Sequence, residues 1–464
     1  MARGKKKEST LTPEEKLAQA LVLESEQPYK IPENWCWTKL GTVSALYNGD
    51  RGVNYPSKKD YVEIGIPFIN AGAIQNNELN HFEFNYITEQ KYDALRAGKI
   101  QKGDILYCLR GSLGKTAIIE IEIKGAISSS LCILRTNAAI LRRFFAYLLQ
   151  SDVIHRQQDI AENGSAQPNL SAASVLKYML PIPPLAEQQR IVDRIESLFA
   201  KLDEAKEKAQ TVLDSFETRK AAILHKAFTG ELTAKWRAEH EIGMDSWKET
   251  TVGSVCHDVK VSIVIKPSQY YTDVENGMPA FRSANVRENH IDNFDWVYLN
   301  QTGMDNNTRS IVHTGDVLVV RSGNPGTACV VTDEFDGYNA IDILIAVPDH
   351  NQVTSEFLCC YTNSPFGKNL VSENKRGMAL AHFNVKGYSG LPIRTPRLTE
   401  QREIVRILDS LFAKEQQAKD AAEAVLEQID LLKKSILARA FRGELGTNDP
   451  NEESAVELVK RVLE

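Results

Sequence analysis

The sequence predicts an α+β protein in which two globular domains alternate with two long helices. Three observations predict this fold class. Residues 187–232 and 400–445 align without a gap, 400 − 187 = 213 positions apart, with about half of their positions identical, a spacing far too long for a solenoid repeat. Both segments have the apolar periodicity of a helix. The stretches before them contain short β-branched and aromatic runs separated by Gly, Pro and Asn, which is typical of strands and turns.

The composition is that of an ordinary soluble protein. The chain has 464 residues, 42% apolar and 25% charged, which allows several domains. Its net charge of −6 creates no global positive field, so a polyanion would have to meet local basic patches. The seven cysteines show no C-x-x-C spacing, which favours reduced thiols over a zinc site or a disulfide framework. Since no run of about 18 apolar residues occurs, we expect a cytoplasmic protein.

The duplication divides the chain into six predicted segments. These are an N-terminal tail and helix (1–30), a first globular domain (31–185), a first spacer helix (186–242), a second globular domain (243–398), a second spacer helix (399–446) and a C-terminal helix (447–464). Thr12 and Pro13 form a helix start near the N-terminus. We expect the two terminal helices to lie near each other or to brace partner subunits.

Each repeated segment predicts one long amphipathic helix. About 40 residues at 1.5 Å per residue form a rod of roughly 60 Å. Arg219 and Glu415 interrupt the apolar stripe, one in each copy. Because a lone stripe has no partner, we expect the rods to pack as an antiparallel coiled coil with an internal pseudo-two-fold. The stripe residues, in a 4-3 spacing, are Ile191, Ile195, Leu198, Leu202, Ala205, Ala209, Val212, Phe216 and Ile223, then Ile404, Leu408, Leu411, Ala418, Ala422, Val425, Ile429, Leu432 and Ile436.

The globular domains also correspond, but faintly. "IPFINAGAI" (66–74) matches "MPAFRSANV" (278–286), and "KGDILYCLRGSLGKTA" matches "TGDVLVVRSGNPGTAC". These domains have diverged much further than the rods. The pattern indicates one common scaffold that carries two differently tuned domains.

The stretch "RGSLGKTA" (110–117) contains, at 114–116, the Gly-Lys-Thr of a phosphate-binding loop. A true P-loop requires a glycine at position 109, which is Leu109, and the second copy has Thr327 where the lysine would stand. The shared requirement is therefore the turn itself. We predict that Gly111, Gly114 and their counterparts Gly323 and Gly326 supply positive-φ positions in a strand-turn-strand.

Other catalytic patterns are equally weak. "NSPF" (363–366) resembles an amino-methyltransferase signature but lacks its first proline, so we interpret it as the interior or end of a helix. Asp104 and Asp316 each follow a glycine, and we interpret them as turn-capping residues ahead of a strand. The nine histidines form no H-E-x-x-H motif. The chain is predicted to bind, not to catalyse.

Three blocks occur twice and in the same order: E-Q-x-x-I-V, L-F-A-K and A-F-x-G-E-L. With the alternation of domain and rod, they make the chain resemble the specificity subunits of type I restriction–modification systems, the HsdS family, over nearly its whole length. The resemblance implies two target recognition domains, each reading one half of a split DNA sequence, and rods that set the gap. It also implies two modification (methyltransferase) subunits that use S-adenosylmethionine at adenine N6, and restriction subunits that use ATP and Mg²⁺. This chain itself would hold no cofactor or metal.

Base readout requires Arg or Lys toward guanine and Asn or Gln toward adenine, and such residues concentrate in the predicted loops. The candidates for DNA binding in the first domain are Arg51, Asn54, Lys58, Lys59, Gln75, Asn76, Arg110, Ser112, Lys115, Gln167 and Asn169. In the second domain they are Lys266, Tyr270, Arg282, Asn285, Arg287, Arg321, Asn324, Lys375 and Arg376. Residues of these types contact phosphates as well as base edges.

Two alternatives remain open from the residues. One is the specificity subunit of a methylation-only or related type II system. The other is a coiled-coil adaptor whose globular domains bind proteins. Salt-sensitive, sequence-selective capture of duplex DNA separates the adaptor from the others.

Overall fold

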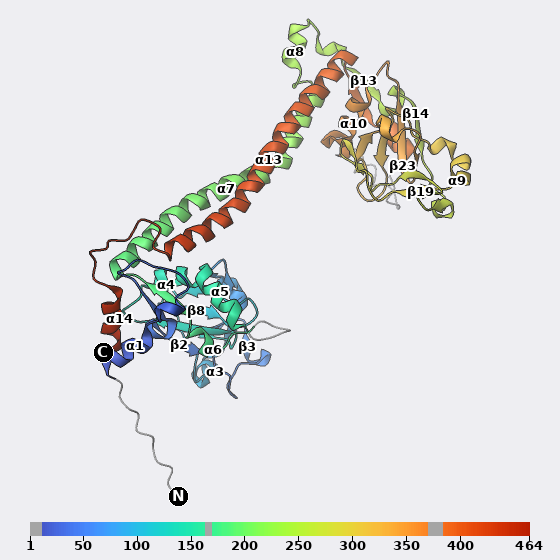
Figure 1. Cartoon of the computed structure of the whole chain (residues 1–464). Helices are drawn as coiled ribbons and strands as arrows, with labels where there is room; N and C mark the ends of the chain where they lie inside the picture. Colours follow the sequence, from blue (N-terminus) through green and yellow to red (C-terminus); the bar gives the residue numbers. More distant parts are fainter. Residues whose placement is uncertain (1–11, 163–168, 370–383) are drawn as a thin grey trace. The chain divides into compact units, whose positions relative to one another are not determined.

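The computed structural model describes residues 12–162, 169–369 and 384–464, and the chain divides into two compact units (Figure 1). Unit 1 comprises Met1–Lys208 and Val425–Glu464, and unit 2 comprises Ala209–Ala424. Two long helices, α7 (Leu185–Thr229) and α13 (Leu398–Ala440), each contribute one half to each unit. None of the described helices is long and apolar enough to cross a membrane.

The globular part of unit 1, residues 36–182, is called head 1. It contains two four-stranded sheets, a short hairpin and a two-stranded closing ribbon. The strands, in sheet order, are β2 (Ser44–Asn48), β11 (Leu131–Thr136), β8 (Ile105–Cys108) and β9 (Thr116–Ile118); β10 (Ala126–Ile127), β4 (Ile66–Ile69), β7 (Asn85–Ile87) and β3 (Tyr61–Val62); β5 (Ile74–Gln75) and β6 (Glu78–Leu79); and β1 (Cys36–Lys39) with β12 (Met179–Ile182). Among these described strands, only β10 and β4 pair in parallel. The described helices of unit 1 besides α7 and α13 are α1 (Pro13–Ala20), α2 (Leu40–Val43), α3 (Glu89–Ala94), α4 (Arg142–Leu149), α5 (Asp152–Ala161), α6 (Ala172–Val175) and α14 (Ala455–Leu463).

The globular part of unit 2, residues 248–395, is called head 2 and repeats this topology strand for strand. Its strands, in the same order, are β14 (Cys256–Val261), β23 (Ile343–Pro348), β20 (Val317–Val320) and β21 (Ala328–Val330); β22 (Asn339–Ala340), β16 (Met278–Phe281), β19 (Val297–Leu299) and β15 (Tyr271–Thr272); β17 (Val286–Arg287) and β18 (His290–Ile291); and β13 (Lys248–Thr251) with β24 (Pro392–Thr395). The described helices of unit 2 besides the rods are α8 (Ala234–Glu239), α9 (Gln301–Asn306), α10 (Ser355–Asn363) and α12 (Val385–Ser389).

Strand β8, in the interior of the larger sheet of head 1, shows why strand sequences in the heads are continuously apolar instead of alternating. All four residues of β8 are buried. Ile105 and Tyr107 join the core under α4 and α5, whereas Leu106 and Cys108 join a second core shared with the hairpin and the smaller sheet. Because successive side chains point to opposite faces of a strand, a strand covered on both faces is apolar throughout. The predicted α+β class is confirmed, with a helix layer on one face of each larger sheet.

The two long helices run antiparallel in each unit. In unit 1, Lys433 pairs with Asp203 at 2.5 Å and lies over the Phe199 ring. In unit 2, Arg219 pairs with Glu415 at 2.8 Å, and Lys419 lies over the Phe216 ring. In unit 2 the α13 number falls from 419 to 415 as the α7 number rises from 216 to 219. In unit 1 Arg190 bonds Thr447, just past the end of α13, whereas Asp203 pairs with Lys433, which is also the antiparallel order. The predicted pairing of the rods is confirmed.

The predicted apolar stripe of the second rod is wrong at three positions. Ala418, Val425 and Leu432 are exposed, although they continue the 4-3 spacing. The seam instead includes Glu415, Lys419 and Lys433, which are half-buried. Lysine can lay its apolar stem along a seam while its ammonium group stays hydrated, so charged residues occupy positions that an apolar pattern assigns to solvent.

The two ends of the chain meet in unit 1, as expected. Helices α1 and α14 pack together, and Lys16 Nζ donates to the Leu463 carbonyl at 3.0 Å. The Tyr29 hydroxyl donates to the Phe441 carbonyl at 2.9 Å, just past the end of α13. The segment after α13 therefore returns to head 1 and packs against it.

Candidate nucleic-acid interface

In each head, loops converge at one end of the larger sheet. In head 1 this is the end where β2 and β8 finish and β9 and β11 begin, as the pairs Asn48–Cys132 and Cys108–Leu131 show. Loops 49–57, 109–115 and 128–130 therefore gather there. The Leu109 N–H donates to the Ser130 carbonyl at 2.8 Å, and the loop before α6 joins them through a 2.8 Å bond from the Leu170 N–H to the Leu109 carbonyl.

The turn after β8 has the geometry predicted for it. Gly111 and Gly114 have φ values of 80° and 75°, and Gly323 and Gly326 have φ values of 83° and 87°. At Gly114 a Cβ would also meet the amide end of the Gln158 side chain, which would have to move, so the positive φ is the main reason for glycine here. The duplicated glycines serve a turn between β8 and β9, and between β20 and β21. This confirms the interpretation of "RGSLGKTA" as a strand-turn-strand.

Arg110 and Asn169 come together at this loop end. Arg110 Nε donates to Asn169 Oδ1 at 3.2 Å, and the two residues also form an isolated antiparallel bridge. Asn54 donates its amide to the Ala94 carbonyl at 2.9 Å. Gln167 lies outside the described residues. The candidates that are exposed in this region are Arg51, Lys58, Lys59, Arg110 and Ser112, while Lys115 and Asn169 are half-buried.

The same end of head 2 carries a different set of groups. Arg321 Nη1 donates to Asp342 Oδ1 at 2.8 Å, and the Ser322 hydroxyl donates to Asp342 Oδ2 at 3.0 Å. The guanidinium of Arg321 is thus held by a carboxylate, in contrast with Arg110. Asn324 and Lys266 are exposed, and Lys266 has a φ of 40°. Lys375 and Arg376 lie outside the described residues.

The remaining described candidates lie in the short hairpin of each head and in the segments next to the strands of the smaller sheet. In head 1, Gln75 and Asn76 are exposed at its tip. In head 2, Arg282 pairs with Asp295 at 2.8 Å and Arg287 with Asp292 at 3.1 Å, so these arginines are presented together with acidic neighbours. Tyr270 is half-buried and packs against a small core cluster.

Asn285 does not belong to the exposed set. Its side chain is fully buried. Its Oδ1 accepts the Arg282 N–H at 2.9 Å, and its Nδ2 donates to the Phe294 carbonyl at 2.8 Å. Both ends of the side-chain amide form hydrogen bonds that stabilise this loop, as is usual for a buried polar group. Asn285 was predicted to contact DNA bases, but its buried side chain stabilises the loop instead.

The two aspartates and the "NSPF" motif are structural. Asp104 Oδ2 accepts the Gln101 N–H at 2.9 Å and both Asp104 oxygens accept from Arg135. Asp316 Oδ2 accepts the His313 N–H at 2.8 Å. Asn363 ends α10 and bonds both backbone groups of Ala328 at 2.9 Å. The turn-capping and helix-end interpretations are confirmed.

The seven cysteines are free and unsuited to reaction. Burial raises the pKa of the Cys36 thiol to about 12, and burial with nearby carboxylates raises the pKa of Cys360 to about 12. Cys329, also buried, has its pKa raised to about 12. A thiol with such a pKa stays protonated at neutral pH and is a poor nucleophile. Within the described residues, no cluster of three or more His, Cys, Asp or Glu side chains suits a metal ion.

A groove of about 1270 Å³ lies in unit 1 between head 1 and the halves of α7 and α13 that belong to this unit. Asn76, Lys115, His155 and Lys433 line it. In unit 2 the counterparts of three of these residues form an ion cluster, in which Glu288 at the hairpin tip pairs with both Lys220 of α7 and Lys368.

The spacing of the repeat relates the two sets: 288 − 76 = 212, 433 − 220 = 213 and 368 − 155 = 213. Burial raises the pKa of the Glu288 carboxyl, but its bonds to Lys220 and Lys368 outweigh burial, so this pKa lies below its ordinary value. The hairpin of head 2 is therefore tied to the rod by charge. At the same place in head 1 stands the neutral Asn76, and Lys433 pairs with Asp203.

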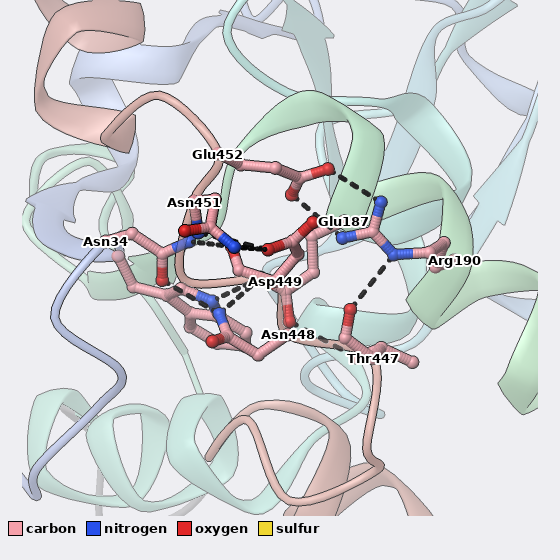
Figure 2. Close-up of polar contacts among 9 residues, drawn as sticks. Asn34, Glu187, Arg190, Thr447, Asn448, Asp449, Asn451 and Glu452 are labelled. Carbon is pink, nitrogen blue, oxygen red and sulfur yellow. Dashed lines mark hydrogen bonds and ion pairs between the residues drawn. The ribbon is translucent and has the colours of Figure 1, made fainter.

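The duplicated Glu-Gln pair at the start of each rod joins the rod to its head, a role that the sequence did not reveal. Figure 2 shows the joint around Glu187 in unit 1. The buried Glu187 accepts Trp35 Nε1 at 2.7 Å and Asn448 Nδ2 at 2.9 Å on Oε2, and the Thr447 hydroxyl at 3.2 Å on Oε1. Arg190, one turn later, forms a bidentate pair with Glu452 at 2.8 Å and donates to the Thr447 carbonyl.

Unit 2 repeats this joint with a different partner. Glu400 accepts Thr233 at 2.7 Å, Trp247 Nε1 at 3.2 Å and the buried Arg237 at 2.6 Å, all on Oε1. The following glutamines also correspond: Gln188 accepts the Leu141 N–H at 2.8 Å and Gln401 accepts the Thr354 N–H at 2.9 Å. The sequence contains one signal for this joint. The Glu-Gln pair at 187 recurs at 400, and Trp35, near the start of the first domain, recurs as Trp247 near the start of the second.

The chain matches the sequence profile of the type I restriction modification DNA specificity domain twice, over residues 32–213 and 244–428. The chain belongs to this family. It is 26% identical over 438 residues to the type I restriction enzyme EcoKI specificity subunit of Escherichia coli strain K12, and 24% identical over 443 residues to the StySPI specificity subunit of Salmonella potsdam. Each alignment covers 90% of this chain and 90% of the relative.

Solved structures show the same fold. The HsdS subunit from Thermoanaerobacter tengcongensis matches with a TM-score of 0.64 at 22% identity, over 91% of this chain and 100% of that one. A structure described as the basis of complex assembly and conformational transition of the type I R-M system matches with a TM-score of 0.67, also at 22% identity, over 90% and 100%. The resemblance inferred from the repeated blocks is confirmed. This specificity subunit recognises DNA for a type I restriction–modification system, with DNA and the other subunits of that system as its partners.

Proposed function

We propose that head 1 and head 2 each read one half of a bipartite, gapped DNA target. The observation that carries this proposal is the contrast between the two loop ends. The heads share topology, strand pairing and rod joints, yet head 1 offers Arg110 beside Asn169, whereas head 2 offers Arg321 held by Asp342. Since bases are distinguished by the donors and acceptors that reach them, unlike loop ends on like scaffolds suit unlike half-sites.

In this proposal the antiparallel rods determine the gap between the half-sites, because half-site spacing follows from protein geometry. Two copies of a methyltransferase subunit dock on the rods, and an internal repeat lets one chain recruit two identical partners. Val425, Leu431 and Leu432 support this docking, since they are exposed apolar residues on α13 outside the seam.

The chemistry belongs to the partners. The methyltransferase subunits use S-adenosylmethionine to methylate adenine at N6, and restriction subunits use ATP and Mg²⁺ for translocation and cleavage. The partners also share the neutralisation of phosphates, which suits the net charge of −6 on this chain. The DNA-contacting residues proposed in head 1 are Arg51, Lys58, Lys59, Arg110, Ser112, Lys115 and Asn169.

Sequencing of methylated adenines in cells that express this chain with its methyltransferase tests the proposal. We expect one gapped bipartite motif. Replacing residues 31–180 with the matching segment of another specificity subunit should change only one half of that motif. A continuous motif, or a change in both halves, contradicts the proposal.

A further inference from the structure

Both heads expose a phenylalanine at the same place in the fold. Phe82 is 99% exposed and Phe294 is 56% exposed. They are 294 − 82 = 212 positions apart, three residues before β7 and β19 respectively. The strand registers agree, since Tyr86 of β7 faces Pro67 of β4, and Tyr298 of β19 faces Pro279 of β16.

The loops that carry these two rings are held by hydrogen bonds. The Phe82 N–H donates to Asn80 Oδ1 at 3.1 Å. The Phe294 carbonyl accepts from the buried Asn285 at 2.8 Å. Two residues later each head packs an aromatic ring against its core, Phe84 in head 1 and Trp296, which contacts Phe281, in head 2. The loop therefore separates one aromatic residue that packs from one that faces water.

A single exposed apolar side chain on a protein surface needs no explanation. The same side chain at equivalent places in two heads that have otherwise diverged does need one, because burying a phenylalanine would have been favourable. Its presence in both heads indicates a surface that both heads require. Under the proposed function the heads read different bases, so a shared exposed ring suits a ligand that is the same for both.

The charge beside each ring favours a protein over the DNA backbone. Glu83 follows Phe82 and Asp295 follows Phe294, and both carboxylates are exposed. In head 2 the Asp295 carboxylate also pairs with Arg282, and this ion pair has no counterpart among the residues named for head 1. What the two heads share is an exposed ring followed directly by a carboxylate. Carboxylates repel phosphates and attract basic side chains.

We propose that Phe82 with Glu83, and Phe294 with Asp295, form two equivalent docking points, each for one copy of the methyltransferase subunit. Each ring enters an apolar pocket on the partner, and the adjacent carboxylate pairs with a lysine or arginine at the rim of that pocket. Aromatic residues are enriched among the anchors of protein interfaces. This inference rests on the proposed function, because it takes its two identical partners from it.

The test uses the full chain titrated with purified methyltransferase subunit, with the number of bound copies measured by native mass spectrometry. We expect two tight sites for the unaltered chain. Phe82→Ser or Phe294→Ser should each weaken one site by about 30-fold and leave the other unchanged, and the double variant should weaken both. Glu83→Lys and Asp295→Lys should act at the same sites. Ile160→Ser, at an 86% exposed residue of α5, is the control and should leave both sites tight.

Two results overturn the docking proposal. Unchanged affinity at both sites in the double variant is one. The other is normal partner binding with reduced affinity of the chain for duplex DNA, which would make the rings DNA contacts. The same preparations separate this outcome from failure of the proposed function. If the complex formed by the unaltered chain does not retain a gapped bipartite DNA, the proposed function fails whatever the phenylalanine variants do.

Discussion

Arg219 of α7 and Glu415 of α13 pair at 2.8 Å in the seam of unit 2, and they are the two residues that interrupt the apolar stripes of their helices. Each side chain is partly exposed, 34% for Arg219 and 21% for Glu415. Each charge therefore finds its partner in the other copy of the repeat. A polar pair inside an apolar seam specifies the register of two helices at a cost in stability.

The first prediction concerns this pair. Replacing both residues by leucine should raise the free energy of unfolding by about 1 kcal/mol or more, because a half-buried ion pair contributes less than apolar packing. Either single leucine variant should lower it, since one charge then remains in the seam without its partner. Urea-induced unfolding measures all three variants. A double variant less stable than both singles would contradict the prediction.

The seam shows what the sequence could and could not predict. The period of the rods and their antiparallel pairing were predictable because they follow from repeated local patterns. The position of the seam in α13 was not, because Lys419 and Lys433 lie over the rings of Phe216 and Phe199. A cation over an aromatic face is stabilised by that ring, and an apolar pattern cannot detect such a contact. The residues that matched the spacing but face solvent are Ala418, Val425 and Leu432.

The candidate site also contains some features that the sequence could predict and others that it could not. The glycine turn after β8 was predictable, since positive φ depends on the residue itself. The fate of Asn285 was not, because its burial depends on the Phe294 carbonyl and other groups of a folded loop. The Glu-Gln joint was visible as a repeat, but its partners Trp35 and Thr447 stand far apart in sequence from Glu187. Conformation set by one residue can be inferred from sequence, whereas contacts between distant segments require the fold.

The second prediction compares the two joints. Glu400→Gln should cost about 3–5 kcal/mol, because it leaves the buried guanidinium of Arg237 without its counter-ion. Glu187→Gln should cost only about 1–3 kcal/mol, because the groups that bond Glu187 are neutral donors and the amide retains one acceptor. Denaturant unfolding of each variant measures the difference. Equal losses of unfolding free energy in the two variants would show that the Arg237 cation does not make the joint of unit 2 more sensitive than that of unit 1.

The third prediction concerns pH. The folded-state pKa of Glu288 is depressed, so its pairs with Lys220 and Lys368 contribute fully above the ordinary glutamate pKa of about 4.3. The contribution is lost as the pH falls through the depressed value. The stability advantage of the unaltered chain over Glu288→Gln should therefore be constant, at about 1 kcal/mol, from neutral pH down to about pH 5. It should decline below the ordinary pKa and vanish once the pH lies below the depressed one.

The matched control for this series is Asn76→Gln in head 1, where the equivalent position is already neutral. Its difference from the unaltered chain should be small and independent of pH. Thermal unfolding at pH values from about 3 to about 7.5, spaced by about half a unit around the ordinary glutamate pKa, measures both variants. An advantage that grows as the pH falls would reverse the sign and exclude the ion cluster as its source.

The fourth prediction separates base contacts from phosphate contacts in head 1. Arg110 lies at the loop end beside Asn169, where a guanidinium can bond the edge of a guanine. Arg110→Ala should therefore weaken binding to the proper target by about 1–3 kcal/mol and relax the sequence preference at one position. Lys58→Ala, at an exposed residue ahead of β3, should weaken binding to all sequences alike and reduce the salt slope by about 1. Fluorescence anisotropy of the complex with single-base variants of the half-site, repeated at several salt concentrations, measures both. If Arg110→Ala lowers affinity equally for every half-site variant, Arg110 contacts the backbone, and the reading surface of head 1 must lie elsewhere on its loops.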